Sequence, residues 1–147
     1  MKKNLQKCTA MLLALVLALS LTACAPVAPE QDDVPLVPVA DGATIGEGSK
    51  TFQMEVTDAD GKVVKFTVKS DADTVGAALL ALGVIAGDDS QYGLYVKSVN
   101  GITADYDKDQ TWWGFYIDGV SATAGVDSTD IADGSTYGFK VESELSN

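Results

Sequence analysis

The stretch TFQMEVTDADGKVVKFTV, at residues 51–68, decides how this sequence is expected to fold. Apolar and polar side chains alternate through residues 51–57 and again through residues 62–68, which is the pattern of strands with one buried face. The four residues between them, Asp-Ala-Asp-Gly, are favourable turn formers. The stretch therefore predicts a β-hairpin whose apolar face needs a covering layer.

The residues that follow the hairpin predict this covering layer, because the hydrophobic period changes there. Val75, Leu79 and Leu82 fall on one stripe of a helix. Asp73 or Thr74 is suited to cap the start of this helix, and a glycine follows its end. We therefore expect a short amphipathic helix that packs against the hairpin.

Further strands are predicted along the second half of the chain. Hydrophobic alternation indicates strands at residues 94–99, 111–117 and 136–141. Asn100-Gly101 and Asp118-Gly119 are pairs of residues typical of hairpin turns. A hairpin followed by one helix and several strands predicts an α+β fold, in which a β-grasp-like mixed sheet has one helix packed on one face.

The charge and composition of the 147-residue chain exclude several functions. It has 10 lysines, no arginine and no histidine, against 21 acidic residues, so the formal net charge is −11. So acidic a chain lacks the basic footprint that binds nucleic acid. It also lacks the imidazole that most often serves as a general base, and the arginine fork that binds phosphate.

The first residues have the features of a bacterial lipoprotein signal peptide. Three lysines within the first seven residues precede an apolar segment at 9–23, which is short for a membrane span. The segment ends in Leu-Thr-Ala-Cys, the lipobox pattern, at Cys24. We therefore predict a signal peptide at residues 1–23 and lipidation of Cys24. The alternatives are an ordinary signal peptide with a chance cysteine and an uncleaved short anchor.

A proline-rich, acidic spacer is predicted between the lipidated cysteine and the domain. All four prolines lie within residues 26–38, among acidic and small residues, and no hydrophobic period is visible before residue 49. We therefore expect a linker at residues 24–48 and one domain at residues 49–147. The predicted location is the cell envelope, on the extracytoplasmic face of the membrane. The acyl chains would provide the attachment, because anionic headgroups repel an acidic chain.

The strand predicted at 111–117 carries aromatic side chains on both of its faces. The more apolar face, which we expect to point into the core, consists of Trp113, Phe115 and Ile117. Trp112 and Tyr116 would then form an exposed shelf with a gap at Gly114, which Tyr95 on the neighbouring strand could extend. Flat aromatic shelves bind flat or ring-shaped ligands. The alternative is that both tryptophans only pack in the core and at its rim.

Several motifs in a fixed order resemble one known family. They are Gly93–Ile102, Thr111–Phe115, Gly125–Asp127 and Ile131–Gly134, together with the helix start Thr74–Leu79. This set resembles the transcobalamin-like C-terminal domain, the small β-domain of cobalamin carriers, which also occurs in bacterial lipoproteins. The family is grouped with the soluble-ligand-binding β-grasp folds.

The resemblance spans about residues 50–142 and implies where a ligand would bind. In the carriers this domain covers one side of a corrinoid and a helical domain holds the other, so a chain without that domain would need a partner. The implied apolar contacts lie near Val96, near Phe115 and in Val120–Ala124. Alternation points Phe115 inward whereas the resemblance points it to the ligand, and the sequence leaves both open. The candidate ligand-binding residues are Tyr95, Val96, Trp112, Trp113, Phe115 and Tyr116.

No motif in the sequence predicts catalysis. Asp105, Asp107 and Asp109 are spaced like the start of a calcium loop, but the glycine and the final glutamate of that loop are missing, so a solvated acidic loop is favoured. Ser121 lies in an incomplete nucleophile motif with no histidine to activate it. We therefore predict that the protein is not an enzyme and has no catalytic residue, metal or cofactor.

Three functions remain compatible with the sequence. The first is a lipid-anchored envelope protein whose domain captures a small ligand, such as the corrinoid cobalamin, and passes it to a transporter. The second is a protein-interaction or adhesion module of the envelope, which binds a partner protein and no small molecule. The third is an accessory to an enzyme with no ligand of its own. The sequence favours the first.

Overall fold

The hairpin predicted from residues 51–68 forms the centre of the larger of two β-sheets. Strand β2 (Lys50–Thr57) pairs antiparallel with strand β3 (Val63–Ser70) in full register. Phe52, Met54 and Val56 point to the same face of β2 and are almost completely buried. The alternation seen in the sequence therefore corresponds to one buried and one solvated face.

This computed structural model describes residues 36–144. The predicted signal peptide, Cys24 and the spacer up to residue 35 lie outside the described residues. Among the described residues, no helix is long and apolar enough to span a membrane.

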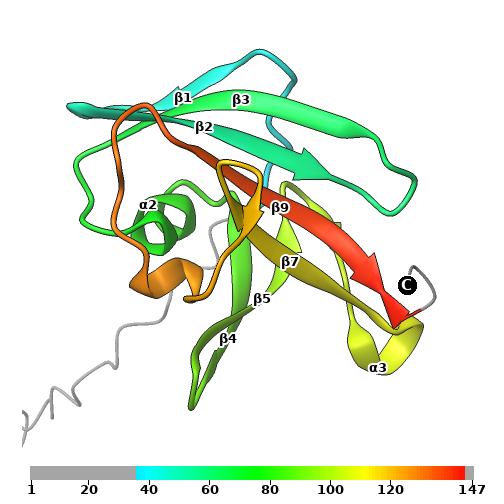
Figure 1. Ribbon diagram of the computed structural model, residues 1–147. Coiled ribbons are helices and arrows are strands. Elements are labelled where there is room, and N and C mark those ends of the chain that lie inside the picture. Colours follow the sequence, from blue (N-terminus) through cyan, green and yellow to red (C-terminus); the bar gives the residue numbers. More distant parts are fainter. Residues whose placement is uncertain (1–35, 145–147) are drawn as a thin grey trace, which may run out of the picture. The chain divides into compact units, whose positions relative to one another are not determined.

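Within residues 36–144 the larger sheet has six strands in the order β1-β3-β2-β9-β7-β8 (Figure 1). Strand β9 is parallel to β2 and antiparallel to β7, so the sheet is mixed as predicted. The strands beside the hairpin are β1 (Thr44–Gly46), β7 (Thr111–Ile117), β8 (Val120–Ser121) and β9 (Thr136–Ser143).

A second, three-stranded antiparallel sheet is formed by β4 (Ile85–Ser90), β5 (Gly93–Val99) and β6 (Ile102–Thr103). The sequence predicts β5 but not a separate sheet, and it favours a polar loop at residues 88–93. That expectation is wrong for residues 88–90, which belong to β4, and for Gly93, which begins β5. Residues 88–90 are polar because this end of the β4–β5 hairpin is exposed, and backbone pairing holds the strand without a hydrophobic pattern.

The predicted helix is α2 (Val75–Ala81), and it packs on the same side of the larger sheet as the smaller sheet does (Figure 1). The Thr74 hydroxyl accepts from the Ala77 N–H at 3.2 Å, which makes Thr74 the cap. Val75 and Leu79 are fully buried against the hairpin and against a single-turn 3-10 helix, η1 (Val126–Ser128). The predicted α+β class, with a β-grasp-like mixed sheet and a helix on one face, is confirmed.

The predicted spacer overlaps the domain. Strand β1 pairs parallel with β3, although residues 44–46 were expected to be linker. Val39, Ala43 and Ile45 pack against the core, and the Asn100 side chain accepts from the Val39 N–H at 2.6 Å and donates to its C=O at 3.2 Å. The boundary predicted at residue 49 therefore lies too late, because a three-residue edge strand is too short to show a hydrophobic period.

We predict that Asn100→Gly weakens the attachment of this segment. Asn100 is buried and has a φ of 50°, which glycine also adopts, so the substitution removes the two hydrogen bonds to Val39 without backbone strain. We expect the free energy of unfolding, measured by urea titration, to fall by about 1 to 3 kcal/mol. Gln110→Gly is the matched control, because Gln110 has a φ of 57° and is exposed. Equal losses in both variants would contradict the attachment.

Candidate ligand-binding cleft

A cleft of about 440 Å³ lies where the two sheets diverge. Residues of β5 and β7 line it, together with Gly125 and Val126 at the start of η1 and Tyr106 of the acidic loop. Its size is within the range of small-molecule sites. The lining residues are Leu94, Tyr95, Val96, Tyr106, Trp112, Trp113, Phe115, Gly125, Val126, Phe139 and Glu144.

Five of the six candidate residues predicted from the sequence line this cleft. Tyr95 and Val96 come from β5, whereas Trp112, Trp113 and Phe115 come from β7. We expected Tyr95 to extend a shelf beside Trp112. It does not, because β5 and β7 belong to different sheets. The two strands face each other across the cleft instead.

The floor of the cleft is continuous with the hydrophobic core. Trp113 is only 8% exposed, and its Nε1–H donates to the Lys97 C=O at 3.1 Å. Phe115 stacks on Tyr137 with ring centroids 6.2 Å apart and contacts Phe139 at 5.1 Å. Phe115 packs on the core and also lines the cleft. The inward orientation and the ligand-facing orientation, which the sequence left open, are therefore compatible.

Tyr106 and Trp112 form the outer edge of the cleft. Their ring centroids are 6.1 Å apart, and the Tyr106 hydroxyl donates to Glu144 Oε1 at 2.5 Å. This hydrogen bond to a carboxylate raises the pKa of Tyr106 above its usual value of 10.0. The sequence gives no signal for Tyr106 or Glu144, because they meet only through the fold. The segment 120–124 does not line the cleft, and the adjacent Gly125 and Val126 do.

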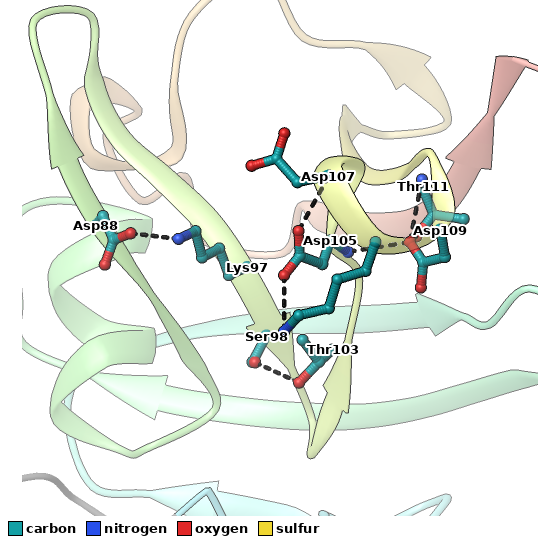
Figure 2. Close-up of polar contacts among 9 residues, drawn as sticks. Asp88, Lys97, Ser98, Thr103, Asp105, Asp107, Asp109 and Thr111 are labelled. Atoms are coloured by element: carbon teal, nitrogen blue, oxygen red, sulfur yellow. Dashed lines mark hydrogen bonds and ion pairs between the residues drawn. The ribbon is translucent and has the colours of Figure 1, made fainter.

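In the acidic loop, the carboxylates of Asp105 and Asp109 turn toward the loop's own backbone, whereas that of Asp107 points away from it (Figure 2). The loop forms the short helix α3 (Tyr106–Asp109), in which Asp105 Oδ1 accepts from the Asp107 N–H at 3.1 Å. Lys108 donates a hydrogen bond to the Asp105 carboxylate in an ion pair at 3.1 Å, and this contact lowers the pKa of Asp105. The Thr111 hydroxyl donates to Asp109 and lowers its pKa. Over the described residues, no three carboxylates form a group that could hold a metal ion.

The opposite face of β7 is not the open aromatic shelf that we predicted. Trp112 Nε1–H donates to Glu142 Oε2 at 3.1 Å, and the Tyr116 hydroxyl donates to Glu142 Oε1. This carboxylate fills the predicted gap, because a Cβ placed on Gly114 would lie 2.7 Å from Glu142 Cδ. The hydrogen bond to Glu142 raises the pKa of Tyr116. Tyr116 therefore points away from the cleft and belongs to a separate surface.

Three comparisons place this geometry among known proteins. Residues 72–143 match a family model described as a domain of unknown function, DUF4430. A crystal structure of a candidate metal-binding protein from Ruminococcus gnavus ATCC 29149 is similar, with a TM-score of 0.61 and 26% identity over 65% of this chain and 98% of that chain. Haptocorrin in complex with Cbi matches with a TM-score of 0.48 and 16% identity, over 67% of this chain and 26% of that chain. A search of the curated proteins finds no match.

We predict that Glu142→Gln lowers the pKa of Tyr116 toward 10.0, because the substitution replaces the hydrogen bond to the carboxylate, which is the largest cause of the raised pKa, and removes the negative charge that opposes ionisation. The pKa of Tyr106, which is held by Glu144, should not move, and it serves as the internal control. The measurement is a pH titration of the tyrosine Cζ carbons by NMR.

The same bond predicts a dependence of stability on pH. Because the pKa of Tyr116 is raised in the folded chain, its contribution to stability is present at neutral pH and is lost as pH rises through that raised value. The free energy of unfolding, measured between pH 9 and pH 12, should fall less in Glu142→Gln than in the unsubstituted chain. This range is set around the usual tyrosine pKa of about 10. An unchanged Tyr116 titration in this variant would contradict the hydrogen bond.

Proposed function

We propose that this domain binds a small ligand in the cleft between its two sheets. The observation that carries the proposal is the convergence of Tyr95, Trp112, Trp113 and Phe115 on one cleft of about 440 Å³. Aromatic side chains provide a large contact area at low conformational cost, which suits a ligand with a flat or ring-shaped apolar part.

The first ligand class to test is a corrinoid. The motifs that resemble the transcobalamin-like domain favour it, and the cleft is formed by the two strands on which that resemblance places apolar contacts. A cleft of this size would cover only part of such a ligand and would leave the other side free. A second protein chain would therefore complete the site. The chemistry needed is binding without catalysis, which agrees with a chain that has no histidine and no arginine.

A metal ion is a weaker candidate for the ligand. The similar protein from Ruminococcus gnavus carries a metal-binding description. In residues 36–144 of this chain no three carboxylates form a group that could hold a metal ion, and two carboxylates of the acidic loop, Asp105 and Asp109, already accept hydrogen bonds from its own backbone.

We further propose that the chain is held by lipid at Cys24 on the extracytoplasmic face of the membrane, where it captures its ligand and passes it to a transporter. The lipobox pattern and the proline-rich spacer support this location. The alternative function is a protein-interaction module. It is favoured by the exposed end of the β4–β5 hairpin, where Tyr92 is 87% exposed.

Calorimetric titration of the chain from Ala25 onward with cyanocobalamin and with cobinamide tests the corrinoid proposal. We expect one-to-one binding that Tyr95→Ala weakens about tenfold, which corresponds to about 1.4 kcal/mol. Tyr92→Ala is the matched control, because both tyrosines are exposed on the same hairpin and only Tyr95 lines the cleft. No heat with either corrinoid would exclude that class. The apolar dye Nile red, whose fluorescence rises in an apolar site, tests the cleft itself. If Tyr95→Ala leaves this fluorescence unchanged, the cleft is not the binding site.

The anchor is tested by Cys24→Ser in cells grown with an alkyne-labelled palmitate. We expect the unsubstituted chain to incorporate the label and to sediment with membranes. The variant should lose the label and appear in the soluble fraction, because no acyl chain then holds it. Label retained by the variant would place lipidation elsewhere.

A further inference from the structure

A second surface lies on the outer face of the larger sheet, opposite the cleft. Because side chains alternate along β7, Trp112 and Tyr116 point to this face, whereas Trp113 and Phe115 point to the core. Trp112 also lines the edge of the cleft, and Tyr116 does not. Lys140 and Glu142 of β9 lie beside them, since Gly114 pairs with Lys140 and Trp112 with Glu142. The face is solvated across its breadth, as Gln53, Lys65 and Lys140 are exposed.

Its central feature is the carboxylate of Glu142, which two aromatic side chains hold in place. Trp112 and Tyr116 lie four residues apart on β7, and each donates one hydrogen bond to a different oxygen of this carboxylate. Both rings must therefore lean toward the position above Gly114. An ionised carboxylate accepts about four hydrogen bonds, so each oxygen keeps the capacity for one more.

Two hollows adjoin this central group. One, of about 350 Å³, is lined by the turn residues Asp58, Ala59 and Gly61 together with Trp112, Lys140 and Glu142. The other, of about 200 Å³, lies over Gly138, beside Tyr116, Glu55 and Lys140. Lys140 lines both, and within residues 36–144 its ammonium group takes part in none of the ion pairs. The surface thus combines aromatic rings, an acceptor with spare capacity and an unpaired donor.

We infer that this outer face binds a neutral saccharide chain. The rings of Trp112 and Tyr116 are half-buried on either side of Glu142, and their accessible parts offer apolar area to the C–H faces of sugar rings. Glu142 accepts from hydroxyl groups, and Lys140 donates to hydroxyl and ring oxygens. The saccharide should be neutral, because Asp58, Glu55 and Glu142 line the hollows and the whole chain has a net charge of −11. The core of a protein–protein interface is typically depleted of charged residues, whereas the centre of this face is a carboxylate.

The test is calorimetric titration of the chain from Ala25 onward with cellohexaose and with chitohexaose, two neutral β-linked hexasaccharides. We expect saturable binding of at least one of them. Tyr116→Ala and Lys140→Ala should each weaken it about fivefold to tenfold, and circular dichroism confirms that each variant is folded. Lys140 is exposed and outside the core, so its variant tests the surface even if Tyr116→Ala does not fold.

The cleft variant separates this inference from the proposed function. Tyr95→Ala should leave saccharide binding unchanged, whereas Tyr116→Ala and Lys140→Ala should leave Nile red binding in the cleft unchanged. No heat with either hexasaccharide would overturn the inference. So would binding that survives both outer-face variants, or binding that Tyr95→Ala abolishes, because the saccharide would then occupy the cleft.

Discussion

The antiparallel pairing of β7 with β9 is the constraint on which both surfaces of this domain depend. Seven residues of β7 are in register with β9, and the alternation of a strand sends successive side chains to opposite faces. The sequence Trp112-Trp113 thus places one indole on the outer face and the next in the core. A shift of register by one residue would exchange these faces and bury Glu142. Phe139 and Val141 prevent this shift, because they pack inward from β9.

The polar contacts of the domain reflect a shortage of cations. Ten lysines against 21 acidic residues leave most carboxylates without a positive partner, and the three ion pairs of the described residues are all exposed at one partner or both. Such pairs contribute little to stability. Neutral donors take their place, since Tyr106 bonds Glu144, Trp112 and Tyr116 bond Glu142, and backbone N–H groups bond Asp105 and Asp109. These bonds should depend less on salt than ion pairs do.

The parts of the fold that the sequence predicts are those encoded by local periodicity. The β2–β3 hairpin, the α2 helix with its Thr74 cap and the inward side of β7 all follow from patterns within about ten residues. The separation of β5 into another sheet, the pairing of β1 and the Glu142 carboxylate above Gly114 are contacts between distant segments. No single-sequence pattern specifies such contacts. The aromatic cleft residues can be recognised from the sequence, because their side chains are read directly from it. Their arrangement across two sheets cannot, because it depends on contacts between distant segments.

The cleft is one-sided, and this geometry bears on how a captured ligand would leave. A ligand held between β5 and β7 would keep part of its surface in solvent, so the apolar area removed from water, and with it the affinity, is limited. A receiving protein can then contact the exposed side before the first contacts break. Under the proposed function, passage between two proteins through such a shared intermediate would avoid release into water, so this geometry would suit transfer better than storage. Tyr116 and Lys140 line the outer hollows and not the cleft, whereas Trp112 lines both, so a ligand in the cleft and a saccharide on the outer face would share contacts with that one residue.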